Sequence, residues 1–104
     1  MTDILVAGGG PAGLTAALYA ARAGKSVLVL EGGAPGGQIT FSPLVENYPG
    51  LPSIPGSQLA EDLLRQAEEQ GVALEYETAT HICTHGSGFQ VTTDCALREC
   101  RALV

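Results

Sequence analysis

The sequence has 104 residues, of which 45% are hydrophobic and 15% charged, and eleven acidic residues against five Lys and Arg give a formal net charge of -6. This composition excludes a disordered segment and allows one domain with one core, while the negative charge makes nucleic acid and anionic membranes poor partners. We expect a cytoplasmic location, because no signal peptide is visible and no apolar stretch approaches the roughly 18 residues that span a bilayer.

The first third of the sequence predicts a βαβ unit. Residues 3–7 form a short apolar run ending at glycine, which is typical of a strand buried on both faces. Residues 11–23 carry apolar side chains at helical spacing, with Pro near the start and Gly24 beyond the end. Residues 27–30 repeat the buried-strand pattern. A right-handed strand–helix–strand unit of this length predicts a parallel sheet and an α/β fold of the Rossmann type.

A glycine motif lies between the first strand and the first helix. Its residues, Gly8-Gly9-Gly10-Pro11-Ala12-Gly13, fit the dinucleotide-binding pattern G-x-G-x-x-G. Gly8 allows a tight turn, Gly10 lets the backbone approach a pyrophosphate, and Gly13 lets the helix lie close to the strand. The helix that begins at Pro11 and Ala12 would then offer unpaired amides and the positive end of its dipole to the diphosphate.

Glu31 closes the second strand eighteen residues after Gly13. In this motif a carboxylate at that place accepts hydrogen bonds from the adenosine ribose and repels a 2′-phosphate, which favours FAD or NAD over NADP. The alternative interpretation is a glycine-rich turn that serves only to reverse the chain.

The rest of the chain predicts a long loop and a second set of elements. Residues 32–56 hold six glycines and five prolines, as expected of a functional loop. A helix is predicted from about residue 57 to residue 71, followed by a strand over 72–76. Residues 80–84 and 89–93 flank a turn and predict an antiparallel hairpin. Residues 102–104 begin a further apolar strand, whereas residues 93–101 look irregular.

The cysteines suggest no cofactor chemistry. Cys83, Cys95 and Cys100 fit neither a zinc site nor a Cys-x-x-Cys pair, so we expect reduced, partly buried thiols. His81 and His85 are interpreted as surface histidines, and no metal site is expected.

Beyond the shared Rossmann features, two spaced segments are more specific. Together with residues 8–24 and 30–31, the segments Gly36-Gly37-Gln38-Ile39 and Val45-Glu46-Asn47-Tyr48-Pro49-Gly50 resemble the opening of low-molecular-weight thioredoxin reductases. The resemblance implies an FAD laid across the βαβ unit, with the loop of residues 34–50 around its ribityl chain and flavin ring. It also implies that Gln38 and Asn47 hydrogen-bond the flavin or ribityl group, and that the backbone of Gly36 and Gly37 passes close to it. From the residues alone, Gln38 and Asn47 could equally satisfy loop backbone groups.

The resemblance further implies a complete enzyme that uses NADPH, FAD and a disulfide, with a thioredoxin-like protein substrate and a homodimer as possible partners. Two alternatives stay open: a ferredoxin-NADP reductase of the thioredoxin-reductase type, or a non-catalytic dinucleotide-binding module. No residue of this chain is a candidate catalytic group, since the flavin carries the redox chemistry.

The domain organisation expected from this resemblance is a single, partial FAD-binding domain over residues 1–104, roughly the first third of such an enzyme. Its parts are the βαβ fingerprint (1–31), the flavin-contacting loop (32–56), a helix and strand (57–77), and a hairpin with the start of a further strand (78–104). The sequence lacks a Cys-x-x-Cys and a second glycine motif for NADPH. In the family the strand that begins at residue 102 lies beside the first strand. Here that strand has only three residues, so we expect the first strand to keep an unpaired edge. We therefore expect the chain alone to bind FAD weakly or not at all, and not to reduce a disulfide.

Overall fold

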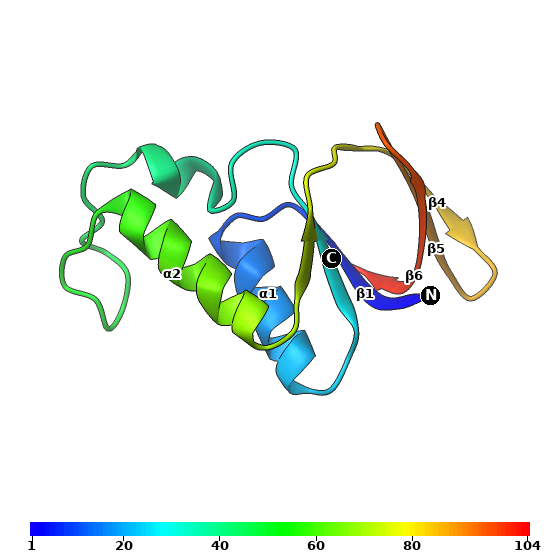
Figure 1. The fold of residues 1–104 in the computed structure, drawn as a ribbon, viewed down its shortest axis with the longest axis horizontal. Helices are drawn as coiled ribbons and strands as arrows, with labels where there is room; N and C mark the ends of the chain where they lie inside the picture. The colour runs from blue at the N-terminus through cyan, green and yellow to red at the C-terminus, as the bar shows by residue number, and fades with distance from the viewer.

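The computed structural model describes residues 1–104. Its first part is a βαβαβ run made of β1 (Thr2–Ala7), α1 (Pro11–Arg22), β2 (Val27–Leu30), α2 (Gly56–Glu69) and β3 (Ala73–Glu75). The three strands and two helices predicted for this region are confirmed, with ends that differ by one or two residues. Helices α1 and α2 lie side by side on the same side of the sheet (Figure 1).

One six-stranded sheet contains every strand, in the order β3-β2-β1-β6-β5-β4. The last three strands are β4 (Ala79–His85), β5 (Gly88–Thr93) and β6 (Leu97–Leu103). The pairs β3–β2, β2–β1 and β1–β6 are parallel, whereas the pairs β6–β5 and β5–β4 are antiparallel. The α/β fold with a parallel sheet and an antiparallel hairpin is therefore confirmed. The molecule is elongated, with extents of 45 × 28 × 19 Å, because the hairpin extends the sheet beyond the helices (Figure 1).

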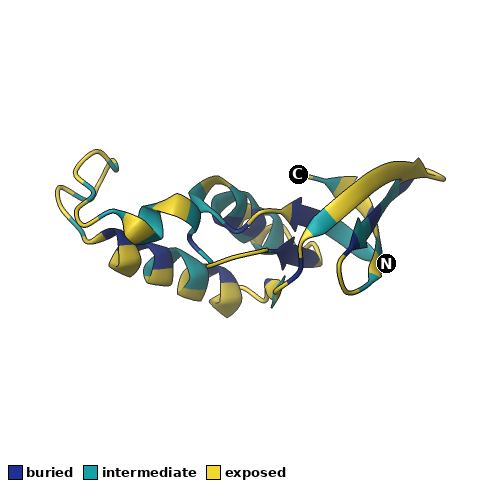
Figure 2. Ribbon diagram, turned by 90° about the horizontal axis from the view of Figure 1, so that it is seen from above, coloured by how far each residue is buried: buried dark blue, intermediate teal, exposed yellow.

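The core lies on both faces of the parallel strands, as the unbroken apolar runs predict. Side chains alternate along each strand, so Val6 and Val29 face the helices while Leu5 and Leu28 face the opposite side. The helix-side cluster is Val6, Leu14, Ala17, Val27, Val29, Ala67 and Val72, and the opposite cluster is Leu5, Leu28, Leu30, Val91 and Cys100. Figure 2 shows these buried segments at the centre of the sheet and on the inner sides of the helices, while β4 at the sheet edge is largely exposed.

The last strand corrects two predictions. Strand β6 begins at Leu97, not at residue 102, and the preceding turn is ordered because Thr93 Oγ1 accepts hydrogen bonds from the N–H groups of Cys95 and Ala96. Residues 97–101 therefore belong to a regular strand, and only the turn of residues 94–96 lies between β5 and β6. The predicted unpaired edge of β1 is also wrong, since β6 pairs along β1 and Ala7 N–H donates to Val104 O at 2.9 Å.

The loop of residues 32–56 carries more structure than predicted. It contains a short 3-10 helix, η1 (Gly37–Phe41), and two isolated bridges, Val45 with Ile54 and Tyr48 with Leu51. Gly56 allows η1 to lie on the start of α2, because a Cβ at Gly56 would be 1.8 Å from the Ile39 carbonyl oxygen.

The cysteines differ in exposure. Cys100 is buried, whereas Cys83 and Cys95 are exposed, so the expectation of partial burial holds only for Cys100. Both His81 and His85 lie at the surface, as predicted. No helix of the structure is both long enough and apolar enough to cross a membrane.

Candidate functional site

The glycine turn connects β1 to α1 at the carboxyl edge of the parallel strands. Gly8 has a φ of 119°, a conformation that favours glycine, and its N–H donates to Leu30 O at 2.8 Å. A Cβ at Gly13 would lie 1.9 Å from Gly8 O, so only glycine permits this helix to approach the turn so closely. A Cβ at Gly8 or Gly10 would meet no atom within 4 Å. The turn thus leaves open space at Gly8 and also at Gly10, the position where the motif predicts an approaching diphosphate.

The start of α1 offers free amide groups to that space. The helix has Gly10 as its N-cap, with no side-chain cap and no acidic residue in the first turn. Its first hydrogen bond runs from Leu14 N–H to Gly10 O at 2.9 Å, and the amides of Ala12 and Gly13 have no acceptor within the chain. Unpaired amides and the helix dipole together make a site for an anion.

Glu31 points into the glycine turn. Its Oε1 accepts from Gly9 N–H at 2.8 Å and its Oε2 accepts from Gly33 N–H at 2.7 Å. These bonds fix the carboxylate, and each oxygen keeps a further lone pair that could accept from a ribose hydroxyl. The contact with Gly9 escaped the sequence prediction, because the motif allows any residue at that position.

A cleft of about 240 Å³ lies next to Glu31 at the carboxyl ends of β1, β2 and β3. Its lining residues are Ala7, Gly8, Leu30, Glu31, Gly32, Glu77, Thr78 and Ala79. Parallel α/β sheets bind ligands at this edge. A larger hollow of about 540 Å³ includes Thr2 and Ser26, at the amino ends of β1 and β2, where such folds do not bind nucleotides. We therefore place the candidate site at the smaller cleft and the turn.

The following loop closes against the glycine turn. Gly36 N–H donates to Gly9 O at 2.7 Å, and a Cβ at Gly37 would lie 3.2 Å from Gly10 Cα. Both Gly36 and Gly37 have positive φ, at 99° and 63°. The structure thus brings these two predicted residues to the turn that contains Gly8, Gly10 and Gly13.

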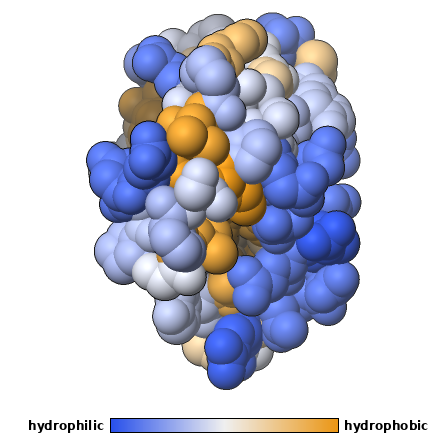
Figure 3. All heavy atoms as spheres, turned by 90° about the vertical axis from the view of Figure 1, so that its left-hand side faces the viewer, coloured by the Kyte–Doolittle hydropathy of each residue, from blue (hydrophilic) through white to orange (hydrophobic).

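Gln38 and Asn47 lie further along the same loop. Gln38 is exposed in η1, and Asn47 is exposed in the segment 46–52, which borders an open hollow of about 550 Å³. Neither side chain forms a hydrogen bond within the chain. The alternative that they satisfy loop backbone groups therefore finds no support. Figure 3 shows an apolar strip on the end of the molecule formed by this loop and α2, and Phe41 and Leu44 are exposed in this loop.

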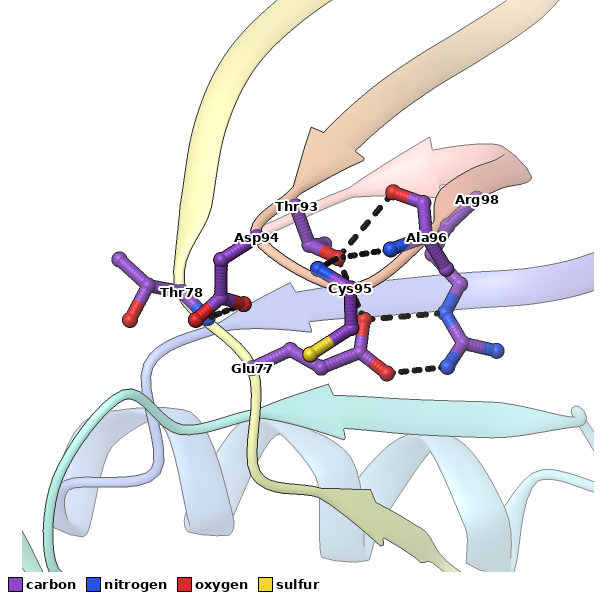
Figure 4. Close-up of polar contacts among 7 residues, drawn as sticks. All are labelled: Glu77, Thr78, Thr93, Asp94, Cys95, Ala96 and Arg98. Carbon is purple, nitrogen blue, oxygen red and sulfur yellow. Dashed lines mark hydrogen bonds and ion pairs between the residues drawn. The ribbon is translucent and has the colours of Figure 1, made fainter.

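The sequence prediction missed a polar cluster beside the cleft. Glu77 is 6% exposed, and its carboxylate pairs with the Arg98 guanidinium and accepts from Thr93 Oγ1 at 2.7 Å (Figure 4). The hydrogen bonds from Arg98 and then from Thr93 lower the pKa of Glu77 below its ordinary value. Glu77 lies 16 residues before Thr93 and 21 before Arg98, and the three residues match no motif, so no local signal could have found the cluster. No group of three or more His, Cys, Asp or Glu side chains is arranged to hold a metal ion.

Comparison with known proteins identifies the family of the chain. The sequence pattern of FAD dependent oxidoreductases matches residues 3–101, so the chain belongs to that family. Within this class, it is similar to thioredoxin reductases and matches their N-terminal part. The Listeria monocytogenes thioredoxin reductase is 37% identical over 102 residues, which are 98% of this chain and 32% of that protein.

Solved structures show the same relationship. The Streptococcus pyogenes thioredoxin reductase matches with a TM-score of 0.95 and 42% identity, over 99% of this chain and 34% of that one. The Lactococcus lactis enzyme matches with a TM-score of 0.95, 36% identity and the same two shares. The chain thus spans about a third of the length of the relatives that it matches.

Proposed function

We propose that this chain binds FAD at the glycine turn. The diphosphate would lie against the amides of Ala12 and Gly13, and Glu31 would accept a hydrogen bond from the adenosine ribose. The observation that carries the proposal is the combination of open space at Gly10, unpaired amides at the start of α1 and a carboxylate fixed beside them. The FAD dependent oxidoreductase family of the chain supports the choice of FAD.

The residues of the loop fit the rest of this cofactor. Gln38 and Asn47 have side-chain amides that are free to donate and to accept, and a neutral amide imposes no charge on a redox ring. When bound, the flavin would supply the redox chemistry. The described residues would bind and orient it, because the turn contains no nucleophile or general base.

For the whole protein we propose an NADPH-dependent flavoprotein that reduces a disulfide in a thioredoxin-like partner, located in the cytoplasm and able to form a homodimer. The name thioredoxin reductase, which its relatives carry, supports the reduction of a thioredoxin-like partner. A ferredoxin-NADP reductase of the same type and a non-catalytic dinucleotide-binding module are the alternatives. The 104 residues contain no Cys-x-x-Cys, so we expect them alone not to reduce a disulfide. Turnover of NADPH and a disulfide by the purified chain would contradict this. The sequence predicts weak FAD binding or none because of an unpaired strand edge; since β6 pairs along β1, we now propose that the chain alone binds FAD.

The binding proposal is tested with Gly10→Val. A branched side chain at this position would project into open space, so the fold would tolerate it while the diphosphate would not. We expect FAD affinity to fall at least about tenfold, which corresponds to about 1.4 kcal/mol. Equilibrium dialysis with FAD measures the affinity, and thermal unfolding without ligand checks the fold. A wild-type chain that does not bind FAD, or a variant that binds it equally well, would overturn the proposal.

A further inference from the structure

The cleft beside Glu31 has a second wall that does not come from the glycine motif. Residues 77–79, which are the end of the connection between β3 and β4 and the first residue of β4, line the cleft together with residues of the turn. At about 240 Å³ the cleft is smaller than pockets that enclose a whole ligand, roughly 300–1,000 Å³, so it would take one end of a dinucleotide. Under the proposed function, on which this inference rests, Glu31 holds the ribose and the cleft receives the adenosine end.

This wall is held in place from the turn between β5 and β6. Thr78 N–H donates to Asp94 Oδ1 at 3.0 Å, and Asp94 N–H donates to Thr78 O at 3.1 Å. Thr93 Oγ1 donates to Glu77 Oε1, and it also accepts from the amides of the turn that follows. Two pairs of residues therefore connect the turn to the wall, Thr93 with Glu77 and Asp94 with Thr78 (Figure 4).

The carboxylate of Glu77 is fully engaged within the protein. Arg98 Nε donates to its Oε1 at 3.3 Å, and Arg98 Nη2 donates to its Oε2. The carboxylate is nearly buried, so it is not placed to accept from a ligand. Arg98 compensates the charge of Glu77. The cleft therefore presents only one carboxylate without a cationic partner, that of Glu31, to an anionic dinucleotide. Glu77 thus acts on the shape and charge of the wall and not by contact with a ligand.

We infer that Thr93, Glu77, Arg98 and Asp94 are positioning residues that hold the wall of residues 77–79 against the adenosine end of the bound dinucleotide. They lie outside the glycine motif and outside the flavin loop. In consequence, the antiparallel part of the sheet contributes to nucleotide binding through the turn of residues 93–96.

The test compares Thr93→Val with Thr93→Ser in the full chain. Valine has the shape of threonine without the hydroxyl, whereas serine keeps it. We expect Thr93→Val to lower the affinities for ADP and for FAD by the same factor, about fivefold to tenfold. This is the effect expected from the loss of one or two buried hydrogen bonds. Thr93→Ser should stay within about twofold of the wild type, because the same bonds form. Isothermal titration calorimetry with ADP and with FAD gives both affinities.

Two further variants separate positioning from loss of stability. Leu63→Ala shortens a partly buried side chain of α2 that does not line the cleft. It should therefore lower the melting temperature without changing the ADP affinity of the folded chain. Asp94→Ala removes the exposed acceptor of Thr78 N–H, and we expect it to lower the ADP affinity as well. This variant decides the question if Thr93→Val does not fold.

The possible outcomes are distinguishable. Folded Thr93→Val and Asp94→Ala chains that bind ADP as tightly as the wild type would overturn this inference and leave the proposed FAD site intact. A wild-type chain that binds neither ADP nor FAD would overturn the proposed function, and this inference with it. Weaker ADP binding in Thr93→Val with recovery in Thr93→Ser would support both.

Discussion

Gly10 and Gly13 lie three residues apart in one motif, yet the structure gives them different roles. A Cβ at Gly10 would meet no atom within 4 Å, whereas a Cβ at Gly13 would overlap the Gly8 carbonyl oxygen. The first glycine leaves room for a ligand, and the second allows α1 to pack against the end of β1. The sequence motif predicted both roles, because the need for each glycine arises within a few residues of the chain.

Gly13→Ala should therefore destabilise the fold itself. The new methyl group would collide with backbone, which cannot move aside as a flexible side chain can. We expect a loss of about 1–3 kcal/mol in the free energy of unfolding. Urea unfolding followed by circular dichroism measures it, with Gly10→Ala as the matched control for the same chemical change in open space. Equal stability of the two variants would contradict this role for Gly13.

At the scale of elements, the prediction succeeded where apolar side chains occupy the buried positions of an element, and it failed where they do not. The apolar spacing of α1 and the unbroken apolar runs of β1 and β2 indicated the βαβ unit directly. Strand β6 was missed over Leu97–Arg101, because its pattern is reversed: Leu97 is exposed, while Arg98 is half-buried. Arg98 faces inward because Glu77 lies there to pair with it.

The inner position of β6 predicts the reactivity of the cysteines. Cys100 lies at 0% exposure in the core cluster opposite the helices, and burial raises the pKa of its thiol. Although Cys95 is exposed, partial desolvation of its thiol and then the neighbouring Asp94 raise the pKa of that thiol, so less of its thiolate forms. Under native conditions at pH 8 we expect iodoacetamide to modify Cys83 and, more slowly, Cys95, while Cys100 reacts only after denaturation.

Mass spectrometry of peptides after timed alkylation would show the order of modification. Denaturation in guanidinium chloride before alkylation is the control that all three thiols can react. Rapid modification of native Cys100 would contradict the placement of β6 between β1 and β5.

At the scale of the whole molecule, the Glu77–Arg98 pair joins the βαβαβ part to the antiparallel strands. Glu77 precedes β4 and Arg98 lies in β6, twenty-one residues away in the sequence. A nearly buried charge pair is stable only while both charges are present, so this link should respond to pH.

Acid should weaken the fold partly through Glu77. Its pKa is lower in the folded chain, because Arg98 and then Thr93 donate to the ionised carboxylate. The contribution to stability is therefore complete above the pKa of an unfolded glutamate, about 4.3, and is lost as the pH falls below that value. We expect Glu77→Gln to show a smaller fall in melting temperature between about pH 5 and pH 3 than the wild type.

Thermal unfolding across this pH range measures the difference. The variant should keep part of the acid sensitivity, because hydrogen bonds from the Ser26 backbone and side chain also lower the pKa of Asp3. Parallel pH profiles for the variant and the wild type would show that Glu77 contributes no pH-dependent stability.

The sequence alone determined the α/β class, the βαβ unit, the glycine turn and the position of Glu31 at the end of β2. These features depend on apolar spacing and on glycines whose effect is local, so they can be read along the chain. Only the tertiary structure decided that β6 pairs with β1, that Glu31 binds the amide of Gly9, and that Arg98 faces Glu77. Each of these contacts joins residues more than twenty positions apart, and folding selects such partners through packing and charge pairing across the sheet, which no local pattern encodes.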